Sequence, residues 1–382
     1  MGFHEFSSPY DWSRIAAYKR TAKAAFGGMI DLSVGSPVDP VPDSVRKSLA
    51  AAANDPNAYG YPATAGTADL RTAIAEWFSA TRNVDLQEIH ADVVPTVGSK
   101  EGVALMASLL HFGEDDVVVQ PKVSYPTYEI GTQLAGAKVL KVDDVADVAS
   151  WRNVPGVKAV WVNSPCNPTG EVYSAERMAG IVAAAREIGA VVLSDECYAL
   201  MQWRGAVNGA EGEADSLAST PCALCDDVCL GSAEGVLYSL SKQSNMAGYR
   251  TAFIAGDESL IASMSAYRKQ IGQIIPGPVQ AAMAAGLRDL ESVKVQHARY
   301  RERLSVLVSA LRAYGYCTDM PDGALYVWVR AKSGDCWTDM EQLAKIGIIA
   351  SPGEFYGAPE CLRFSATASD EAIASAAERL AR

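Results

Sequence analysis

The middle of the chain alternates between short runs of β-forming residues and longer segments with helical periodicity, and this alternation constrains the fold most. Helix-length segments occupy 100–110, 128–134 and 174–187. The predicted strands are 93–96, 117–120, 138–142, 159–163, 191–194, 236–239 and 251–255. The alternation predicts an α/β fold with a mostly parallel sheet between helices, because parallel strands need crossover connections. Ligand chemistry should then gather at the carboxyl ends of the strands.

Near residue 278 the pattern changes, which predicts a second, smaller α+β unit. A long charged helix is expected over 279–314, a short strand over 325–330 and a closing helix over 370–380. The expected domains are a segment 1–45 that contributes to the small domain, a large domain 46–277 and a small C-terminal domain 278–382.

Composition and charge exclude several classes of protein. The 382 residues are 49% apolar and 20% charged, which is typical of a soluble globular protein. The net charge of -12 opposes a phosphate backbone, so we expect no nucleic-acid partner. Residues 1–20 lack the apolar core of a signal peptide, and no apolar run approaches the ~18 residues of a membrane helix. We therefore expect a cytoplasmic protein with no membrane partner.

The cysteines indicate free thiols. Eight of them occur in a chain without a secretory signal, which argues against a disulfide framework. Cys222, Cys225 and Cys229 have a spacing similar to that of metal ligands, but no fourth Cys or His follows closely, as a closed zinc site requires. We expect these three to be thiols in or just after a loop over 207–227, and no bound metal.

A lysine at the end of a predicted strand is the first candidate for chemistry. Lys242 follows Ser239 and Ser241, and Arg250 comes eight residues later. A lysine amine can form an imine with a carbonyl cofactor, and hydroxyls with a guanidinium suit a phosphate monoester. An ordinary solvated loop can contain the same residues, so this motif needs support from others.

Two other predicted strands also end in polar residues. Asn167 lies after 159–163, in a loop that two prolines and a glycine make tight. Asp195 closes the next apolar strand, where burying an unpaired acid would be expensive, so we expect a cationic partner. A protonated pyridine nitrogen would serve, because the acid would keep the ring able to accept electrons. Tyr198 would reach the phenolic oxygen of the same ring.

Two segments upstream complete the set. Gly98, Ser99 and Lys100 lead from a strand into a helix, and backbone amides at a helix N-terminus bind anions such as phosphate. Tyr125 has the shape to stack on a planar ring, although a core aromatic is an equal alternative.

In this order and approximate spacing, these segments resemble the fold-type I pyridoxal 5'-phosphate (PLP) enzymes, specifically the class I and II aminotransferases. The likeness runs from Asp31 to the final helix. It implies the α/β PLP-dependent transferase fold of type I, in which a large domain has a mostly parallel mixed sheet between helices and a smaller domain is α+β. It also implies that PLP is held as a Schiff base on Lys242.

The resemblance assigns a role to each matching position. Lys242 matches the catalytic lysine, Asp195 the partner of the pyridine nitrogen, and Arg363 the arginine that clamps the substrate α-carboxylate. Tyr61 matches a tyrosine that reaches the phosphate of the partner subunit, which implies a homodimer with active sites shared across the interface. The other matching positions are Gly98, Ser99, Lys100, Ser239, Ser241 and Arg250 for the phosphate, Tyr125, Asn167 and Tyr198 for the ring, and Gly35 and Asn167 for the substrate.

Finer detail in 35–42, 62–66, 124–131 and 241–250 looks like the actinobacterial succinyldiaminopimelate aminotransferases of lysine biosynthesis. That likeness implies an exchange between glutamate/2-oxoglutarate and N-succinyl-LL-2,6-diaminopimelate/N-succinyl-2-amino-6-oxopimelate. These small amino and keto acids carry distal carboxylates, so a further cation should line the pocket. The candidates are Lys100, Lys122, Arg14 and Arg20.

Three other functions compete with this interpretation. One is a class I/II aminotransferase for another substrate, and another is a PLP carbon–sulfur lyase, because the same carbanion can eliminate a β-substituent. The third is a PLP-sensing regulatory domain, which the acidic charge disfavours because it opposes DNA binding.

Overall fold

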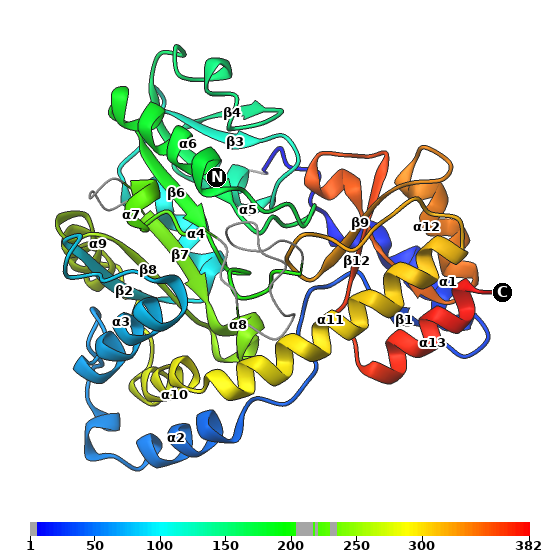
Figure 1. Ribbon diagram of the computed structural model, residues 1–382, viewed down its shortest axis with the longest axis horizontal. Coiled ribbons are helices and arrows are strands. Elements are labelled where there is room, and N and C mark those ends of the chain that lie inside the picture. Colours follow the sequence, from blue (N-terminus) through cyan, green and yellow to red (C-terminus); the bar gives the residue numbers. More distant parts are fainter. Residues whose placement is uncertain (1–5, 204–216, 218–220, 230–234) are drawn as a thin grey trace, which may run out of the picture.

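The computed structural model describes residues 6–203, 217, 221–229 and 235–382, and its largest element is a seven-stranded sheet (Figure 1). The strand order is β2-β8-β7-β6-β5-β3-β4. The strands are β2 (Ala91–Val97), β3 (Val117–Pro121), β4 (Lys138–Val142), β5 (Val157–Asn163), β6 (Val191–Asp195), β7 (Gly235–Ser239) and β8 (Thr251–Asp257). All neighbours are parallel except β8, which is antiparallel to β2 and β7. The seven predicted strands and the mostly parallel mixed sheet are confirmed.

Helices cover both faces of this sheet. On one face lie α2 (Asp43–Ala53), α3 (Ala68–Arg82), α6 (Ala175–Glu187), α7 (Asp226–Cys229) and α10 (Gly277–Arg288). On the other lie α4 (Ser99–Leu109), α5 (Thr127–Leu134) and α9 (Glu258–Gln270). Alternate strand residues belong to the two cores: Val160 packs on the first face, and Ala159 and Trp161 pack on the second. Burial on both faces explains why the strands are almost continuously apolar.

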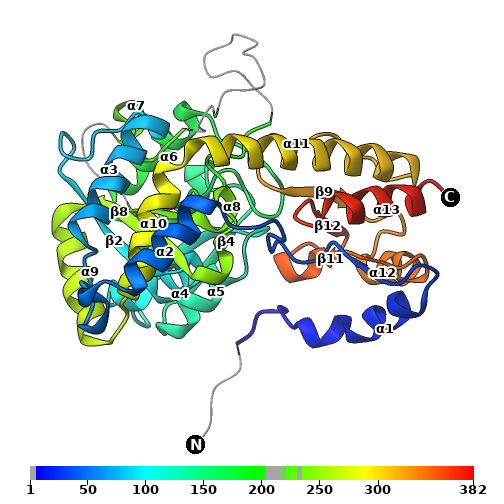
Figure 2. The same ribbon diagram turned by 90° about the horizontal axis from the view of Figure 1, so that it is seen from below.

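A second unit contains the C-terminal part of the chain. Its antiparallel sheet has the order β11-β12-β9, and its helices enclose a separate apolar core. The elements are β9 (Tyr326–Arg330), β11 (Ser351–Pro352), β12 (Cys361–Ser365), α11 (Leu290–Ala313), α12 (Cys336–Lys345) and α13 (Asp370–Leu380). The N-terminal segment joins this unit, because β1 (Ile30–Asp31) pairs in parallel with β10 (Ile348–Ile349) and α1 (Ala16–Ala24) packs against α12 (Figure 2).

The single helix predicted over 279–314 is wrong. Two helices, α10 and α11, meet at Asp289, whose backbone leaves the helical region with φ -87° and ψ 64°. The Asp289 carboxylate accepts a hydrogen bond from the Ser292 amide at 3.1 Å and so caps the second helix. Aspartate competes with the helix for backbone donors in this way. Beyond this break, α11 runs from the large unit to the small one (Figure 1).

Two further expectations concern the rest of the chain. The loop predicted over 207–227 lies largely outside the described residues. Among the helices that the structure describes, none is long and apolar enough to cross a membrane.

Candidate active site

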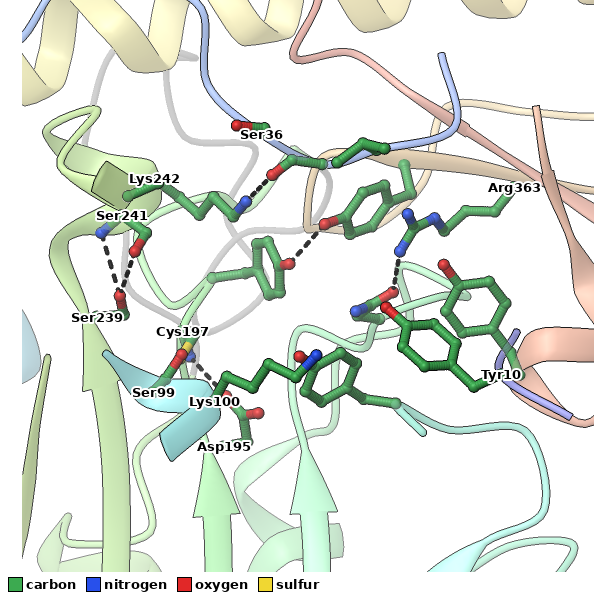
Figure 3. Close-up of a pocket in the computed structure, with 18 of the residues that line it drawn as sticks. Tyr10, Ser36, Ser99, Lys100, Asp195, Cys197, Ser239, Ser241, Lys242 and Arg363 are labelled. Atoms are coloured by element: carbon green, nitrogen blue, oxygen red, sulfur yellow. Dashed lines mark hydrogen bonds between the residues drawn. The ribbon is translucent and has the colours of Figure 1, made fainter. Parts of the chain in front are cut away.

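A cavity of about 270 Å³ lies where the carboxyl edge of the large sheet meets the N-terminal segment and the small unit (Figure 3). Twelve of the fourteen predicted site residues line it: Gly35, Ser99, Lys100, Tyr125, Asn167, Asp195, Tyr198, Ser239, Ser241, Lys242, Arg250 and Arg363. Gly98 lies directly behind the wall, and a Cβ atom there would overlap the Arg250 guanidinium. Tyr61 lies outside the cavity with its side chain fully exposed.

Lys242 reaches the cavity because the chain turns sharply at the end of β7. Ser239 is the N-cap of the short helix α8 (Leu240–Gln243), and its hydroxyl accepts a hydrogen bond from the Ser241 amide at 3.1 Å. This turn directs the Lys242 amine toward the N-terminal segment, where it donates a hydrogen bond to the Gly35 carbonyl (Figure 3). The lysine amine thus lies between the two units.

Asp195 ends β6 as a buried carboxylate on the cavity wall, 6% exposed. Tyr128 donates a hydrogen bond to it at 2.8 Å, and the Cys197 amide donates another at 3.2 Å. Burial raises its pKa, and these hydrogen bonds only partly oppose the effect. No ammonium or guanidinium group of the described residues pairs with it. A cationic ligand ring would therefore stabilise the charged carboxylate.

Hydroxyls and cations also line the cavity. Ser99 begins α4, so the free amides of the first helical turn lie beside its hydroxyl. Arg250 donates to the Ala247 carbonyl at 2.8 Å and lies close enough to Lys100 that burial, together with the Arg250 charge, lowers the pKa of that lysine. Two cations so close favour a bound dianion. The Ser239 and Ser241 hydroxyls line the same cavity.

Arg363 projects from β12 and is 4% exposed. It donates to Asn167 Oδ1 at 2.7 Å and to the Ser33 carbonyl at 2.8 Å. Its guanidinium carbon also lies 4.0 Å from the centre of the Tyr326 ring and 4.7 Å from that of Tyr356. No carboxylate of the described chain neutralises it, so its charge remains available to an anionic ligand.

Sequence reasoning missed several residues of this cavity. Tyr326, on β9, shares a 2.7 Å hydrogen bond with the Tyr198 hydroxyl and so links the two units. Tyr356 and the N-terminal Tyr10 and Trp12 add aromatic surface. The apolar run in 325–330 indicated a strand but not which strand it pairs with. The N-terminal aromatics carried no usable signal.

The four candidate cations for a distal carboxylate occupy different places. Lys100 alone among them lines the cavity, with its amine 5.4 Å from the centre of the Tyr10 ring. Arg14 pairs with Glu354 at 2.6 Å, and Lys122 pairs with Asp143 at 2.8 Å. Arg20 lies exposed on α1.

Comparison with known proteins identifies the family. A model of the aminotransferase class I and II family matches residues 27–380. The chain belongs to this family. A 4-dedimethylamino-4-oxo-anhydrotetracycline transaminase, OxyQ, of Streptomyces rimosus is 39% identical over 376 residues, which cover 97% of this chain and 98% of that protein. A probable aminotransferase of Mycobacterium tuberculosis is also 39% identical over 379 residues, covering 97% and 84%. The solved structure of a probable N-succinyldiaminopimelate aminotransferase from Thermus thermophilus is 27% identical, with a TM-score of 0.81 and coverage of 97% and 99%.

As a class I and II aminotransferase, the chain is a PLP-dependent enzyme of the fold-type I architecture, and both predictions are confirmed. The residues present fit the cofactor. The buried carboxylate of Asp195 suits a protonated ring nitrogen, and the hydroxyls and cations around Ser99 and Arg250 suit its phosphate. Enzymes of this family act on small amino and keto acids.

The predicted metal-free thiols are only partly described. Cys222 is buried and Cys225 is partly exposed, both as free thiols, whereas the Cys229 side chain lies outside the description. Among the side chains that are described, no three His, Cys, Asp or Glu residues are grouped as metal ligands would be.

Proposed function

We propose that this aminotransferase exchanges an amino group between glutamate/2-oxoglutarate and a dicarboxylic partner, and that the partner is N-succinyl-LL-2,6-diaminopimelate/N-succinyl-2-amino-6-oxopimelate in cytoplasmic lysine biosynthesis. The observation that carries the proposal is the placement of Arg363 and Lys100 in one cavity, where each can bind a separate carboxylate. The likeness to the probable succinyldiaminopimelate enzyme of Thermus thermophilus supports the same substrate.

Each residue has a task in this reaction. Bound PLP supplies a ring that takes up electrons from the substrate α-carbon. Asp195 keeps the ring nitrogen protonated, and Tyr198 donates a hydrogen bond to the ring oxygen. The Lys242 amine would hold the cofactor and would move the substrate α-proton as a general base and acid. Arg363, oriented by its hydrogen bond to Asn167, would hold the substrate α-carboxylate in the same cavity as that amine.

Lys100 is the residue proposed to bind the distal carboxylate. The cavity-facing position distinguishes it from Arg14 and Lys122, whose charges are already paired. Figure 3 shows its side chain extending into the cavity from the start of α4. The backbone amides at that helix start remain available to the cofactor phosphate, so one turn serves both anions.

A panel of amino acceptors tests the substrate. Glutamate-dependent amination of the succinylated keto acid should exceed amination of aromatic and branched-chain keto acids. Lys100→Ala should lower kcat/KM for the dicarboxylic acceptor by about tenfold or more relative to kcat/KM for a keto acid with a neutral side chain, because a charge-assisted hydrogen bond to the substrate is lost. Lys122→Ala, which removes a surface ion pair, is the matched control. An unchanged ratio of the two kcat/KM values in Lys100→Ala contradicts the assignment.

A second substrate class has support of its own. The transaminase OxyQ is named for a fused aromatic ketone. Six aromatic side chains line this cavity, and four of them have no predicted contact with the cofactor and would suit such a ring system: Tyr10, Trp12, Tyr326 and Tyr356. The acceptor panel should therefore include a polycyclic aromatic ketone. Faster amination of that ketone would replace the diaminopimelate proposal. Pyruvate release from cystathionine without an acceptor would instead support the lyase alternative.

We also propose a homodimer with shared active sites. Tyr61 is fully exposed and does not line the cavity of its own chain. A phosphate contact in a second subunit would explain this position. Size-exclusion chromatography with light scattering should give a mass of twice the 40.5 kDa of one chain. A monomeric enzyme with full activity contradicts the shared site.

A further inference from the structure

Cys222 and Cys225 are brought together by a turn that precedes α7. The Cys225 amide donates a hydrogen bond to the Cys222 carbonyl at 3.0 Å, which closes a four-residue turn. Such a turn holds its first and last Cα atoms within about 7 Å, and disulfides span Cα distances of about 4.4–6.8 Å. The Leu224 amide donates a hydrogen bond to Cys222 Sγ at 3.5 Å, and Cys225 Sγ donates one to the Arg82 carbonyl at 3.4 Å. The turn therefore already holds the two Cα atoms at a separation close to the one that a disulfide requires.

The two thiols differ in access and acidity. Cys222 is completely buried, whereas Cys225 is partly exposed. Burial, followed by the hydrogen bond with Cys225, raises the pKa of Cys222 well above its usual value. The hydrogen bond from Cys222 lowers the pKa of Cys225, and the nearby Arg82 guanidinium acts in the same direction. A partly exposed thiol with a lowered pKa beside a buried one is the arrangement of an attacking and a resolving cysteine.

This turn is joined to the candidate active site through Glu196. The Ala223 amide, between the two cysteines, donates to Glu196 Oε1 at 2.9 Å. Arg82 donates to the other carboxylate oxygen at 2.5 Å, and both side chains of this ion pair are almost completely buried. Glu196 directly follows Asp195, whose carboxylate lines the cavity. A change in the backbone of this turn would therefore move Glu196, which is adjacent to Asp195, the proposed partner of the ring nitrogen.

We propose that Cys222 and Cys225 form a redox-active dithiol, that low-molecular-weight disulfides oxidise it to an intramolecular disulfide, and that this modification weakens cofactor binding through Glu196 and Asp195. A Cys-X-X-Cys pair in a chain of α/β organisation is typical of redox chemistry. The inference concerns thiols that take no part in transamination, so it stands apart from the proposed substrate.

The oxidation balances in two exchange steps. The Cys225 thiolate attacks one sulfur of the external disulfide, so that bond breaks, a mixed disulfide forms and one small thiolate leaves. Cys222 then gives up its proton and attacks the Cys225 sulfur, which forms the intramolecular bond and releases the second small thiolate. The pair loses two electrons, the external disulfide gains them, and the two protons pass to the released thiolates.

Thiol mapping on the reduced holoenzyme tests the modification. After treatment with glutathione disulfide, peptide mass spectrometry should find Cys222 joined to Cys225, and dithiothreitol should reverse the bond. Cys225→Ser and Cys222→Ser should each prevent it, whereas Cys317→Ser, which removes an exposed cysteine elsewhere, should not. The mapping on the unsubstituted enzyme needs no variant, so a folding defect cannot hide the result. Both thiols remaining free, a disulfide to Cys229 instead, or one equivalent of zinc on the thiols each overturns the proposal.

Cofactor affinity tests the coupling. Oxidation should raise the PLP dissociation constant about fivefold or more, the usual lower bound for coupled sites, and reduction should restore it. The Cys317→Ser enzyme should respond like the unsubstituted one, and Cys225→Ser should not respond. An oxidised enzyme that binds PLP with unchanged affinity overturns the coupling, whichever substrate the enzyme uses.

Discussion

Replacing Tyr326 with phenylalanine removes one hydrogen bond in the candidate active site, and this bond links the two units of the fold. The Tyr326 hydroxyl lies 2.7 Å from that of Tyr198, and its ring lies 4.0 Å from the Arg363 guanidinium carbon. Phenylalanine keeps the ring, so the cation–π contact with Arg363 remains. Only the contact between the two hydroxyls is lost.

The direction of the effect follows from the charges around the pair. Although burial opposes it, the charges of Lys242 and Arg363 lower the pKa of Tyr326, whereas burial raises the pKa of Tyr198. Either hydroxyl could donate by geometry, and we expect the more acidic Tyr326 to be the donor, which would leave the Tyr198 hydrogen free for the cofactor ring oxygen. A hydrogen bond donated by Tyr326 makes Tyr198 a stronger donor in turn. Tyr326→Phe weakens that donation and leaves the ring oxygen more basic.

The value of one buried neutral hydrogen bond sets the upper limit of the shift, because Tyr198 still donates to the ring oxygen. Its net value is about 1 kcal/mol, and 1.36 kcal/mol corresponds to one pKa unit, so the midpoint should move by a fraction of a unit, at most about 0.7. A more basic ring oxygen holds more strongly the proton that it shares with the nitrogen joining the cofactor to Lys242. The loss of this proton changes the visible absorption band of the holoenzyme, so the pH midpoint of that change should rise. A spectrophotometric pH titration measures this midpoint without turnover.

Tyr356→Phe is the matched control for this titration. Tyr356 also faces Arg363, but its hydroxyl pairs with Ser351 Oγ at 3.1 Å and does not contact Tyr198. Its loss should leave the midpoint unchanged. An unchanged midpoint in Tyr326→Phe, or an equal shift in both variants, refutes the assigned direction of donation.

Three further outcomes are expected. Lys242→Ala should abolish both turnover and the visible absorbance of the attached cofactor, and retention of either property contradicts its role. Arg363→Ala, which removes the guanidinium that Asn167 orients, should lower kcat/KM roughly a hundredfold in steady-state assays. This factor corresponds to a loss of about 3 kcal/mol of transition-state stabilisation. Although burial opposes it, the hydrogen bond from Arg303 lowers the pKa of Asp39, so its stabilising effect is present above the ordinary pKa of about 3.9 and disappears as the pH falls through the lower folded value. Urea unfolding from about pH 5 to about pH 3 should therefore show a smaller loss of stability in Asp39→Asn than in the unsubstituted protein.

The large sheet could be predicted because its strands carry their own signal. Both of its faces are buried, so strands such as β5 and β8 read as apolar runs whatever their neighbours are. The break at Asp289 could not be predicted in the same way. It interrupts a charged helical pattern at a position without proline, and the hydrogen bond from Ser292 that caps the second helix is visible only in the folded chain.

The residues of the site also differ in whether a local sequence pattern could predict their position. Asn167, Asp195 and Lys242 follow parallel strands, and parallel strands bring their carboxyl ends to one edge, so strand order hardly matters to their convergence. Tyr326 instead reaches the cavity through the pairing of β9 with β12, where Arg363 lies opposite Trp328 and Tyr326 lies two residues away on the same face. A slip of one residue would turn Tyr326 to the other face. The pairing register between distant segments is therefore what places Tyr326 beside the proposed carboxylate clamp, and no local pattern in either strand contains it.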